Sequence, residues 1–243
     1  MNFKVNILFL FLICLPLSGF SQEEDTLENQ TTYHREMSGM LFIHTHGYGI
    51  NYRTAKHISV DKKRFFESDF CSMRHAKNYV IASSQISETR RYTYGELNSV
   101  GLLRVGYGKQ KLLAGKTLKN NLEIRFLYVG GVSLAFLKPM YYELDLPNDS
   151  LAYDKFNAST KDYIAGGAGY GKGFNEISVM PGIYGKLAIG FDYASKYNHI
   201  RALETGLVFD IYYKDVPILA ETKNYPYFLS FYVGIRYGKK WYR

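Results

Sequence analysis

The sequence predicts an all-β protein, a closed antiparallel transmembrane β-barrel of about eight strands that follows a cleaved signal peptide. Three observations lead to this prediction. Long segments alternate strictly between large apolar residues and small or polar residues, which is the period of a strand with two different faces. Aromatic residues are abundant, with 23 Tyr and 16 Phe among 243 residues. A short apolar leader precedes the alternating segments.

The leader, residues 1–21, has the pattern of a secretory signal peptide. Lys4 supplies the positive start, and the apolar core from 7 to 17 has the expected length. Gly19 and Ser21 are the small residues that precede a predicted cut. This pattern predicts a mature chain that begins at residue 22.

The composition excludes several other classes of protein. A chain this rich in Tyr, Phe, Val, Ile and Leu can bury a large surface, so we do not expect a disordered protein. Two Cys cannot make a disulfide scaffold, and removal of the leader leaves Cys71 unpaired. With a mean hydropathy of −0.21 and no long apolar stretch after the leader, a multi-span helical membrane protein is also excluded. We expect a periplasmic tail over residues 22–32 and a barrel over residues 33–243.

Seven blocks show the alternation, near residues 48–55, 63–74, 98–110, 121–142, 177–194, 200–213 and 227–241. A single-chain outer-membrane barrel needs an even number of strands. We therefore place an eighth strand within Tyr33–Thr45, with a turn at His46-Gly47. Short periplasmic turns are expected near 55–62, 111–120 and 195–199, and longer outward connections near 75–97, 143–176 and 214–226.

The two faces of these strands indicate two different surroundings. Ile183, Leu187 and Ile189 alternate with Tyr184 and Lys186, and the other blocks repeat this arrangement. The apolar face ends in aromatic residues near the strand tips, as lipid-facing girdles do. Only a closed sheet leaves no unpaired backbone edge in lipid, so the apolar face is expected outside and the other face inside.

The inward face carries charges of both signs in similar number. An eight-stranded barrel is just wide enough for side chains to fill its lumen, where unpaired charges would be costly. We therefore predict a structural charge network inside the barrel, and a polar or proton path remains the alternative. Its predicted members are Glu67, Asp69, Arg104, Glu123, Arg125, Lys186, Asp192, Glu204, Asp210 and Arg236.

Two short motifs point weakly to ligands. The segment from Gly166 to Lys172 fits G-x4-G-K, but Gly173 stands where a phosphate-binding loop needs Ser or Thr, so an outward loop is favoured. His44 and His46 would share a face on one continuous strand and could bind a metal, but no Cys or carboxylate close in sequence completes the site. We predict a turn or interfacial role for both His, with no metal and no cofactor.

An enzyme is the less favoured reading. Some small outer-membrane barrels modify lipids with Ser and His at the outer rim, and Ser83, Ser84, His75 and His199 are available. Their spacing does not select a triad. We therefore predict no catalytic residues.

A set of short motifs resembles one group of proteins. It includes Lys63–Glu67, Leu103–Gly108, Glu123–Phe126, Gly130–Leu134, Gly182–Lys186, Arg201–Glu204 and Tyr237–Tyr242. This set resembles a family of uncharacterised small outer-membrane β-barrel proteins of Bacteroidota, over residues 39–242. The resemblance implies an outer-membrane barrel inserted through a C-terminal aromatic signal, and it brings no catalytic residues. This chain ends in Arg243 rather than in an aromatic residue.

These observations favour a structural, interaction or accessory component of the cell outer membrane. The alternatives are a narrow channel or an accessory of protein export and, third, a lipid-modifying enzyme. Expected partners are outer-membrane lipid and lipopolysaccharide, the barrel-assembly machinery during insertion, and proteins that contact the outward connections. The net charge of +8 is spread over turns in a secreted chain, so no nucleic-acid partner is expected.

Overall fold

The computed structural model describes residues 35–59, 61–75, 77, 80–82, 91–115, 122–146, 150–157, 163–193 and 198–241. These belong to one compact unit, Thr32–Arg243. The predicted signal peptide and periplasmic tail lie outside the described residues, as do Ser83 and Ser84.

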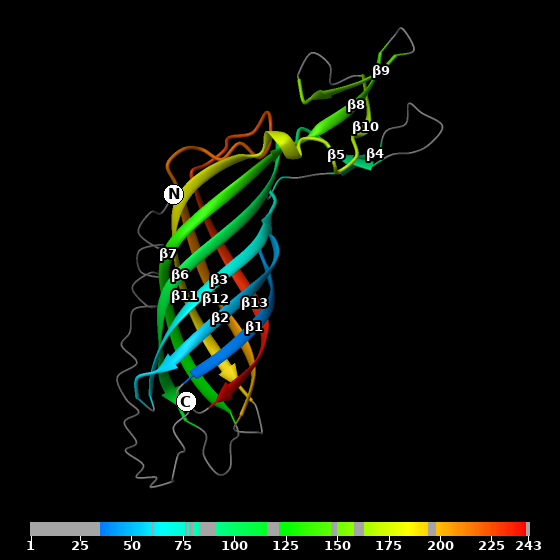
Figure 1. The fold of residues 1–243 in the computed structure, drawn as a ribbon. Helices are drawn as coiled ribbons and strands as arrows, with labels where there is room; N and C mark the ends of the chain where they lie inside the picture. Colours follow the sequence, from blue (N-terminus) through cyan, green and yellow to red (C-terminus); the bar gives the residue numbers. More distant parts are fainter. Residues whose placement is uncertain are drawn as a thin grey trace, which may run out of the picture. The chain divides into compact units, whose positions relative to one another are not determined.

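The structure confirms a closed antiparallel barrel of eight strands, with the order β1-β13-β12-β11-β7-β6-β3-β2 (Figure 1). The strands are β1 Arg35–His44, β2 Gly47–His57, β3 Lys62–Met73, β6 Asn98–Ala114, β7 Glu123–Pro139, β11 Ser178–Asp192, β12 His199–Tyr212 and β13 Tyr227–Trp241. The barrel closes between its first and last strands, where Arg35 lies opposite Trp241 and His44 opposite Tyr232.

The first hairpin is present, with one difference from the prediction. Its turn is Thr45-His46, so Gly47 is already the first residue of β2. Gly47 is required there because a Cβ atom would collide with the Ser72 backbone of β3. The close approach of a neighbouring strand, rather than the turn itself, therefore explains this glycine.

The turn between β2 and β3 lies within the predicted range 55–62, whereas much of the predicted turns near 111–120 and 195–199 lies outside the described residues. The first strand of the β6–β7 hairpin extends further than predicted. β6 continues to Ala114 because Leu112 pairs with Arg125 and Ala114 with Ile124, across a bulge in the register. The two ends of the barrel therefore differ in their connections. We call the end with the hairpins β2–β3, β6–β7 and β11–β12 the short-turn end. The opposite end, which carries the tight β1–β2 turn together with the three long connections, is the long-connection end.

The long connections contain structure that the sequence did not predict. Among the described residues they hold β4 Val80–Ala82, β5 Arg91–Thr93, β8 Tyr141–Leu146, β9 Ser150–Lys155, β10 Ile164–Gly167 and the 3-10 helix η2 Phe174–Glu176. β10, β8 and β9 form a three-stranded sheet, and β4 pairs with β5. The prediction of a plain loop over 166–172 is wrong at its start, because Gly166 and Gly167 pair with Glu143 and Tyr142 in that sheet.

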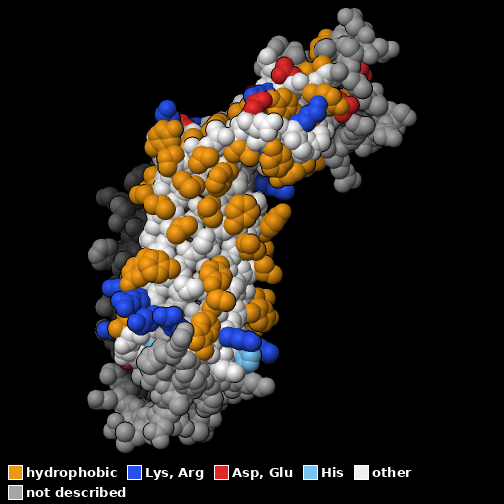
Figure 2. Space-filling view, viewed as in Figure 1, with side chains coloured by type: hydrophobic (Ala, Val, Ile, Leu, Met, Phe, Trp, Pro, Cys, Tyr) orange, Lys and Arg blue, Asp and Glu red, His pale blue; other side chains and the backbone are white. Residues whose placement is uncertain are grey.

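The burial pattern confirms the two faces of the barrel strands. In β11, exposed and buried residues alternate from Ile183 to Gly190, with Tyr184, Lys186 and Ala188 inside. Large apolar side chains are exposed on all eight barrel strands, among them Leu41, Ile43, Ile50, Phe70, Val105, Val132, Ile183, Leu187, Leu207, Leu229, Phe231 and Ile235. Figure 2 shows such side chains spread over the barrel surface, with Lys and Arg gathered near its short-turn end. No helix in the described ranges has the length and apolar character of a membrane span.

Candidate functional site

The centre of the lumen holds an ion pair network that joins opposite walls of the barrel. Arg53 of β2 lies between two carboxylates, with its Nη2 atom 2.7 Å from Glu67 Oε2 and its Nη1 atom 2.8 Å from Glu204 Oε2. The Phe65 ring packs against the guanidinium, 4.3 Å from ring centroid to Cζ. Because Glu67 belongs to β3 and Glu204 to β12, Arg53 links strands that are not neighbours in the sheet.

Two more cations complete this central layer. Lys186 pairs with Glu67 and with Asp69, whose Oδ2 atom lies 2.9 Å from Nζ. Arg236 donates to Glu204 Oε2 over 3.1 Å, and the Tyr232 hydroxyl donates to Glu204 Oε1 over 2.7 Å. Arg53, Lys186 and Arg236 thus balance Glu67, Asp69 and Glu204. The charge balance and the hydrogen bonds offset the cost of burying all six.

A second layer lies toward the long-connection end. Arg104 donates to both oxygens of Asp210, over 2.8 Å from Nε and 2.7 Å from Nη2. Its Nη1 atom lies 3.3 Å from the sulfur of Cys71, which is a buried free cysteine. This two-point contact matches the planar guanidinium to the carboxylate, a geometry that Lys cannot reproduce.

A third layer lies toward the short-turn end. Lys63 Nζ lies 2.6 Å and His57 Nε2 2.7 Å from Glu36 Oε1. Lys240 bridges this group to Asp192 over 3.6 Å. In the same layer Arg125 pairs with Glu123.

The structure places all ten predicted lumen charges on the inward side, and it adds members that the sequence analysis missed. Nine of the ten are buried, and Glu123 is partly exposed. The missed members include the buried residues Glu36, Asn51, Arg53, Lys63 and Tyr232 and the partly exposed His57 and Lys240. The parity of β2 could have identified Arg53, because Asn51, Arg53 and Ala55 alternate with exposed residues. Lys63 shares the parity of Glu67 in the same way.

Side chains of the described residues occupy the lumen at all three charge layers. Between the central layer and the short-turn end they leave a cavity of about 30 Å³. Beside the second layer, toward the long-connection end, the hydroxyl groups of Tyr212 and Ser133 share a hydrogen bond of 2.8 Å. The Tyr212 ring packs edge-on against Phe228. At these levels the described side chains therefore pack against one another inside the barrel.

The last long connection closes the lumen at its own end. Val216 and Ile218 are 1% exposed and belong to the same apolar cluster as Met73 and Leu102. The Asn224 side chain holds this segment in place by accepting from the Ile218 amide and donating to the Leu219 carbonyl, both over 3.1 Å. We call residues 216–219 the plug segment.

The plug segment also contacts the connection between β5 and β6. Leu97 donates its amide to the Ile218 carbonyl over 2.9 Å, and Glu96 forms a bridge with Leu219. Tyr142 of β8 donates to the carbonyls of Thr93 and Glu96, over 2.8 and 3.0 Å. Burial raises the pKa of the Glu96 carboxyl and that of the Tyr142 hydroxyl.

Neither ligand motif of the sequence becomes a metal or catalytic centre among the described residues. His44 Nε2 lies 3.1 Å from the Ser72 carbonyl, and His46 Nδ1 lies 3.0 Å from Ser230 Oγ. No group of three metal-ligating side chains occurs in the described ranges. His75 follows β3 at the long-connection end, whereas His199 begins β12 at the short-turn end, so these two do not share a rim.

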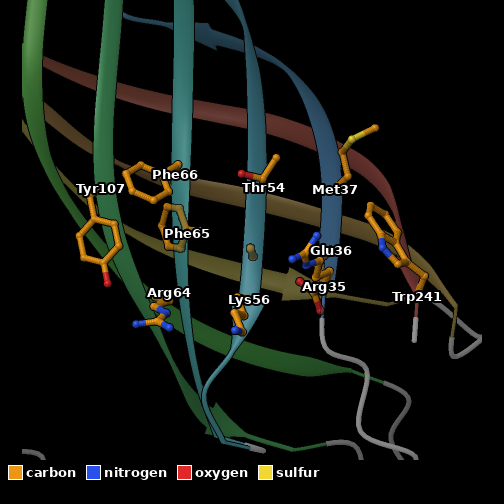
Figure 3. A pocket seen from close by; sticks show the side chains of 11 residues that line it. Arg35, Glu36, Met37, Thr54, Lys56, Arg64, Phe65, Phe66, Tyr107 and Trp241 are labelled. Atoms are coloured by element: carbon orange, nitrogen blue, oxygen red, sulfur yellow. The ribbon is translucent and has the colours of Figure 1, made fainter. Parts of the chain in front are cut away.

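A groove lies on the outward face at the short-turn end, with a volume of about 430 Å³. Figure 3 shows Thr54 at its centre, with Phe66 and Tyr107 on one side and Met37 and Trp241 on the other. In the same view the cations Arg35, Lys56 and Arg64 stand in a row beside these residues, toward the chain ends and turns.

No family model matches this sequence, and no curated protein matches it. The resemblance to proteins of Bacteroidota therefore stays a prediction. Among solved structures, the chain is similar to Neisserial surface protein A (NspA), with a TM-score of 0.43 and 10% identity over 86% of this chain and 97% of that one. It is also similar to Ail, the attachment invasion locus protein of Yersinia pestis, with a TM-score of 0.41 and 6% identity over 86% of this chain and 100% of that one.

Proposed function

We propose that this chain is an outer-membrane barrel with a sealed lumen that serves as a structural or interaction component. The observation that carries the proposal is a distribution of side chains opposite to that of a water-soluble protein, with apolar residues outside and charged residues inside. Ile43, Ile183 and Leu187 are 68%, 60% and 55% exposed, whereas Arg104, Lys186 and Glu204 inside are each 2% exposed. Such a surface suits hydrocarbon, and a closed sheet leaves no backbone edge to be satisfied there.

The charge layers and the plug segment support the sealed lumen. A channel for solutes would need the layers of Arg53 and Arg104 to separate, and each separation would strand buried charges. An activity based on contacts requires no such opening. The elements at the long-connection end, β4, β5 and β8–β10, supply the surface for contacts with other proteins or with lipopolysaccharide.

The proposal also covers how the barrel reaches the membrane and whether it catalyses a reaction. An exposed apolar belt is unfavourable in water, and in the cell the barrel-assembly machinery of the outer membrane assists its insertion into lipid. The proposed role includes no catalysis and no cofactor. Under the enzyme alternative, removal of the gene would change the membrane lipids. Under the export-accessory alternative, it would change the secretion of other proteins.

Two measurements test the proposal. Fractionation of cells that express the chain should place it in the outer membrane, with gel migration that shifts on heating because the folded barrel resists detergent. Planar-bilayer recordings of the purified protein should show no large, steady conductance. A monomer that stays soluble without surfactant would refute the membrane placement, and a steady open conductance would refute the sealed lumen.

A further inference from the structure

The groove beside Thr54 combines an apolar floor and walls with a cationic rim. The register aligns Met37, Thr54, Phe66 and Tyr107 across four adjacent strands. Thr54 is the small member of this row, so the larger side chains stand above it on both sides. The Phe66 and Tyr107 rings, with centroids 5.1 Å apart, make one continuous wall.

The cations form the next row toward the short-turn end. Arg35 lies opposite Lys56, Lys56 opposite Arg64, and Arg64 opposite Lys109. Arg35, Lys56 and Arg64 are exposed, and no described carboxylate forms an ion pair with them. Trp241, opposite Arg35, closes the row on the far side.

Glu36 also lines the groove, but its charge is compensated on the lumen side. Its carboxylate contacts Lys63 and His57 and is buried. The outward charge of the groove is therefore positive. A volume of about 430 Å³ lies in the range of small-molecule sites, roughly 300–1,000 Å³.

We propose that this groove binds an anionic glycerophospholipid of the periplasmic leaflet. This inference rests on the proposed function, because only a membrane-inserted barrel presents the groove to lipid. The phosphate and the anionic headgroup lie against Arg35, Lys56 and Arg64, where juxtamembrane cations attract anionic lipid. One acyl chain lies over Thr54, between Phe66 and Met37. The cations lie at the end that carries the short turns, which faces the periplasm in an outer-membrane barrel.

Native mass spectrometry of the protein in detergent tests the site directly. The probe is an equimolar mixture of phosphatidylglycerol and phosphatidylcholine with identical acyl chains. We expect at least about tenfold more retained phosphatidylglycerol, because each interfacial cation contributes a factor of roughly five. The variant R35Q/K56Q/R64Q should retain the two lipids about equally.

The matched control removes the same charge elsewhere. Arg201, Lys214 and Lys223 are exposed and lie outside the groove, so R201Q/K214Q/K223Q should keep the preference of the wild type. A second variant, Thr54→Trp, fills the floor of the groove and keeps every cation. It should lower the retention of phosphatidylglycerol if a chain lies there.

Three results would overturn the inference: no headgroup preference in the wild type, equal losses in R35Q/K56Q/R64Q and its control, or unchanged retention in Thr54→Trp. If the wild type shows no headgroup preference and a preference appears only after deletion of residues 23–28, which contain Glu23, Glu24, Asp25 and Glu28, the groove is occupied by that acidic segment rather than by lipid. Insertion into phosphatidylcholine vesicles, followed by heat-shifted migration, separates the two proposals. A barrel that inserts without headgroup preference loses only the lipid site, whereas failure to insert removes the proposed function as well.

Discussion

Arg104 and Asp210, which are 106 residues apart in sequence, form a two-point ion pair inside the barrel between β6 and β12. Their side chains are 2% and 0% exposed. Since β7 and β11 separate β6 from β12 in the sheet, this pair connects walls that no backbone ladder joins. It also explains how a carboxylate and a guanidinium are tolerated among Leu102, Tyr212 and the plug segment.

Removal of one member of this pair should be more harmful than removal of both. We expect Arg104→Met to lower the free energy of unfolding by about 3–5 kcal/mol, because Asp210 then stays buried without a partner. The double variant R104M/D210L should recover most of this loss. Urea unfolding of the barrel in phospholipid vesicles, followed by heat-shifted gel migration, measures both values.

The control for this prediction is Arg201→Met, on the outward face of β12. An exposed cation without a buried partner should change stability by about 0.5 kcal/mol or less. Equal losses in the single and double variants would show that the cation matters through packing rather than through charge compensation.

The period of the sequence predicts which side of the barrel a residue occupies, but not which residue it meets there. Lys186 and Tyr184 are placed inside by alternation alone, whereas the partner of Arg104 depends on the register of four strands. Arg53 lies in a short block beside the first hairpin, where few alternating residues define the two faces. Val216 and Ile218 lie in a connection without alternation of apolar and polar residues. Their burial depends on tertiary contacts at the long-connection end of the barrel. The strands within the long connections, β4, β5 and β8–β10, have three to six residues each and are too short to display alternation.

Leu187 tests the lipid-facing assignment. It is 55% exposed and lies between Tyr128 and Leu207, both of which also face outward. We expect Leu187→Arg to cost about 2–4 kcal/mol of folding free energy in vesicles, because an arginine then lies in hydrocarbon. The same substitution at Tyr213, just beyond β12, should cost about 0–1 kcal/mol because that position is near the interface. Similar costs at the two positions would contradict the membrane placement.

Cys71 offers a probe for the plug segment. The residue is 1% exposed and belongs to the same apolar cluster as Val216 and Ile218, and it is the sole cysteine after residue 14. Asn224→Ala removes the hydrogen bonds that hold Ile218 and Leu219, at a local cost of about 1–3 kcal/mol. We expect maleimide to label Cys71 about 5- to 150-fold faster in this variant, measured by mass spectrometry in folded protein.

The neighbouring exposed residue Lys223 provides the control, because Lys223→Ala leaves the Asn224 contacts intact. Its labelling rate should equal that of the wild type. Labelling of Cys71 that is equally slow in Asn224→Ala would mean that the charge layers alone, and not the plug segment, exclude the reagent.

Glu96 should make the long-connection end sensitive to pH. Burial raises the pKa of its carboxyl, and the hydrogen bond from Thr93 and the charge of Arg74 only partly oppose this effect. A raised folded-state pKa means that the folded segment binds the proton more tightly than the unfolded one. The stabilising contribution is therefore complete below the ordinary carboxyl pKa of about 4.3 and is lost as pH rises through the folded value. Hydrogen exchange of residues 92–97, corrected for intrinsic rates, should be slower at pH 4.5 than at pH 8. Glu96→Gln should remove this dependence, whereas Glu221→Gln, on an exposed side chain, should keep it. A pH dependence that persists in Glu96→Gln would assign the effect to another group.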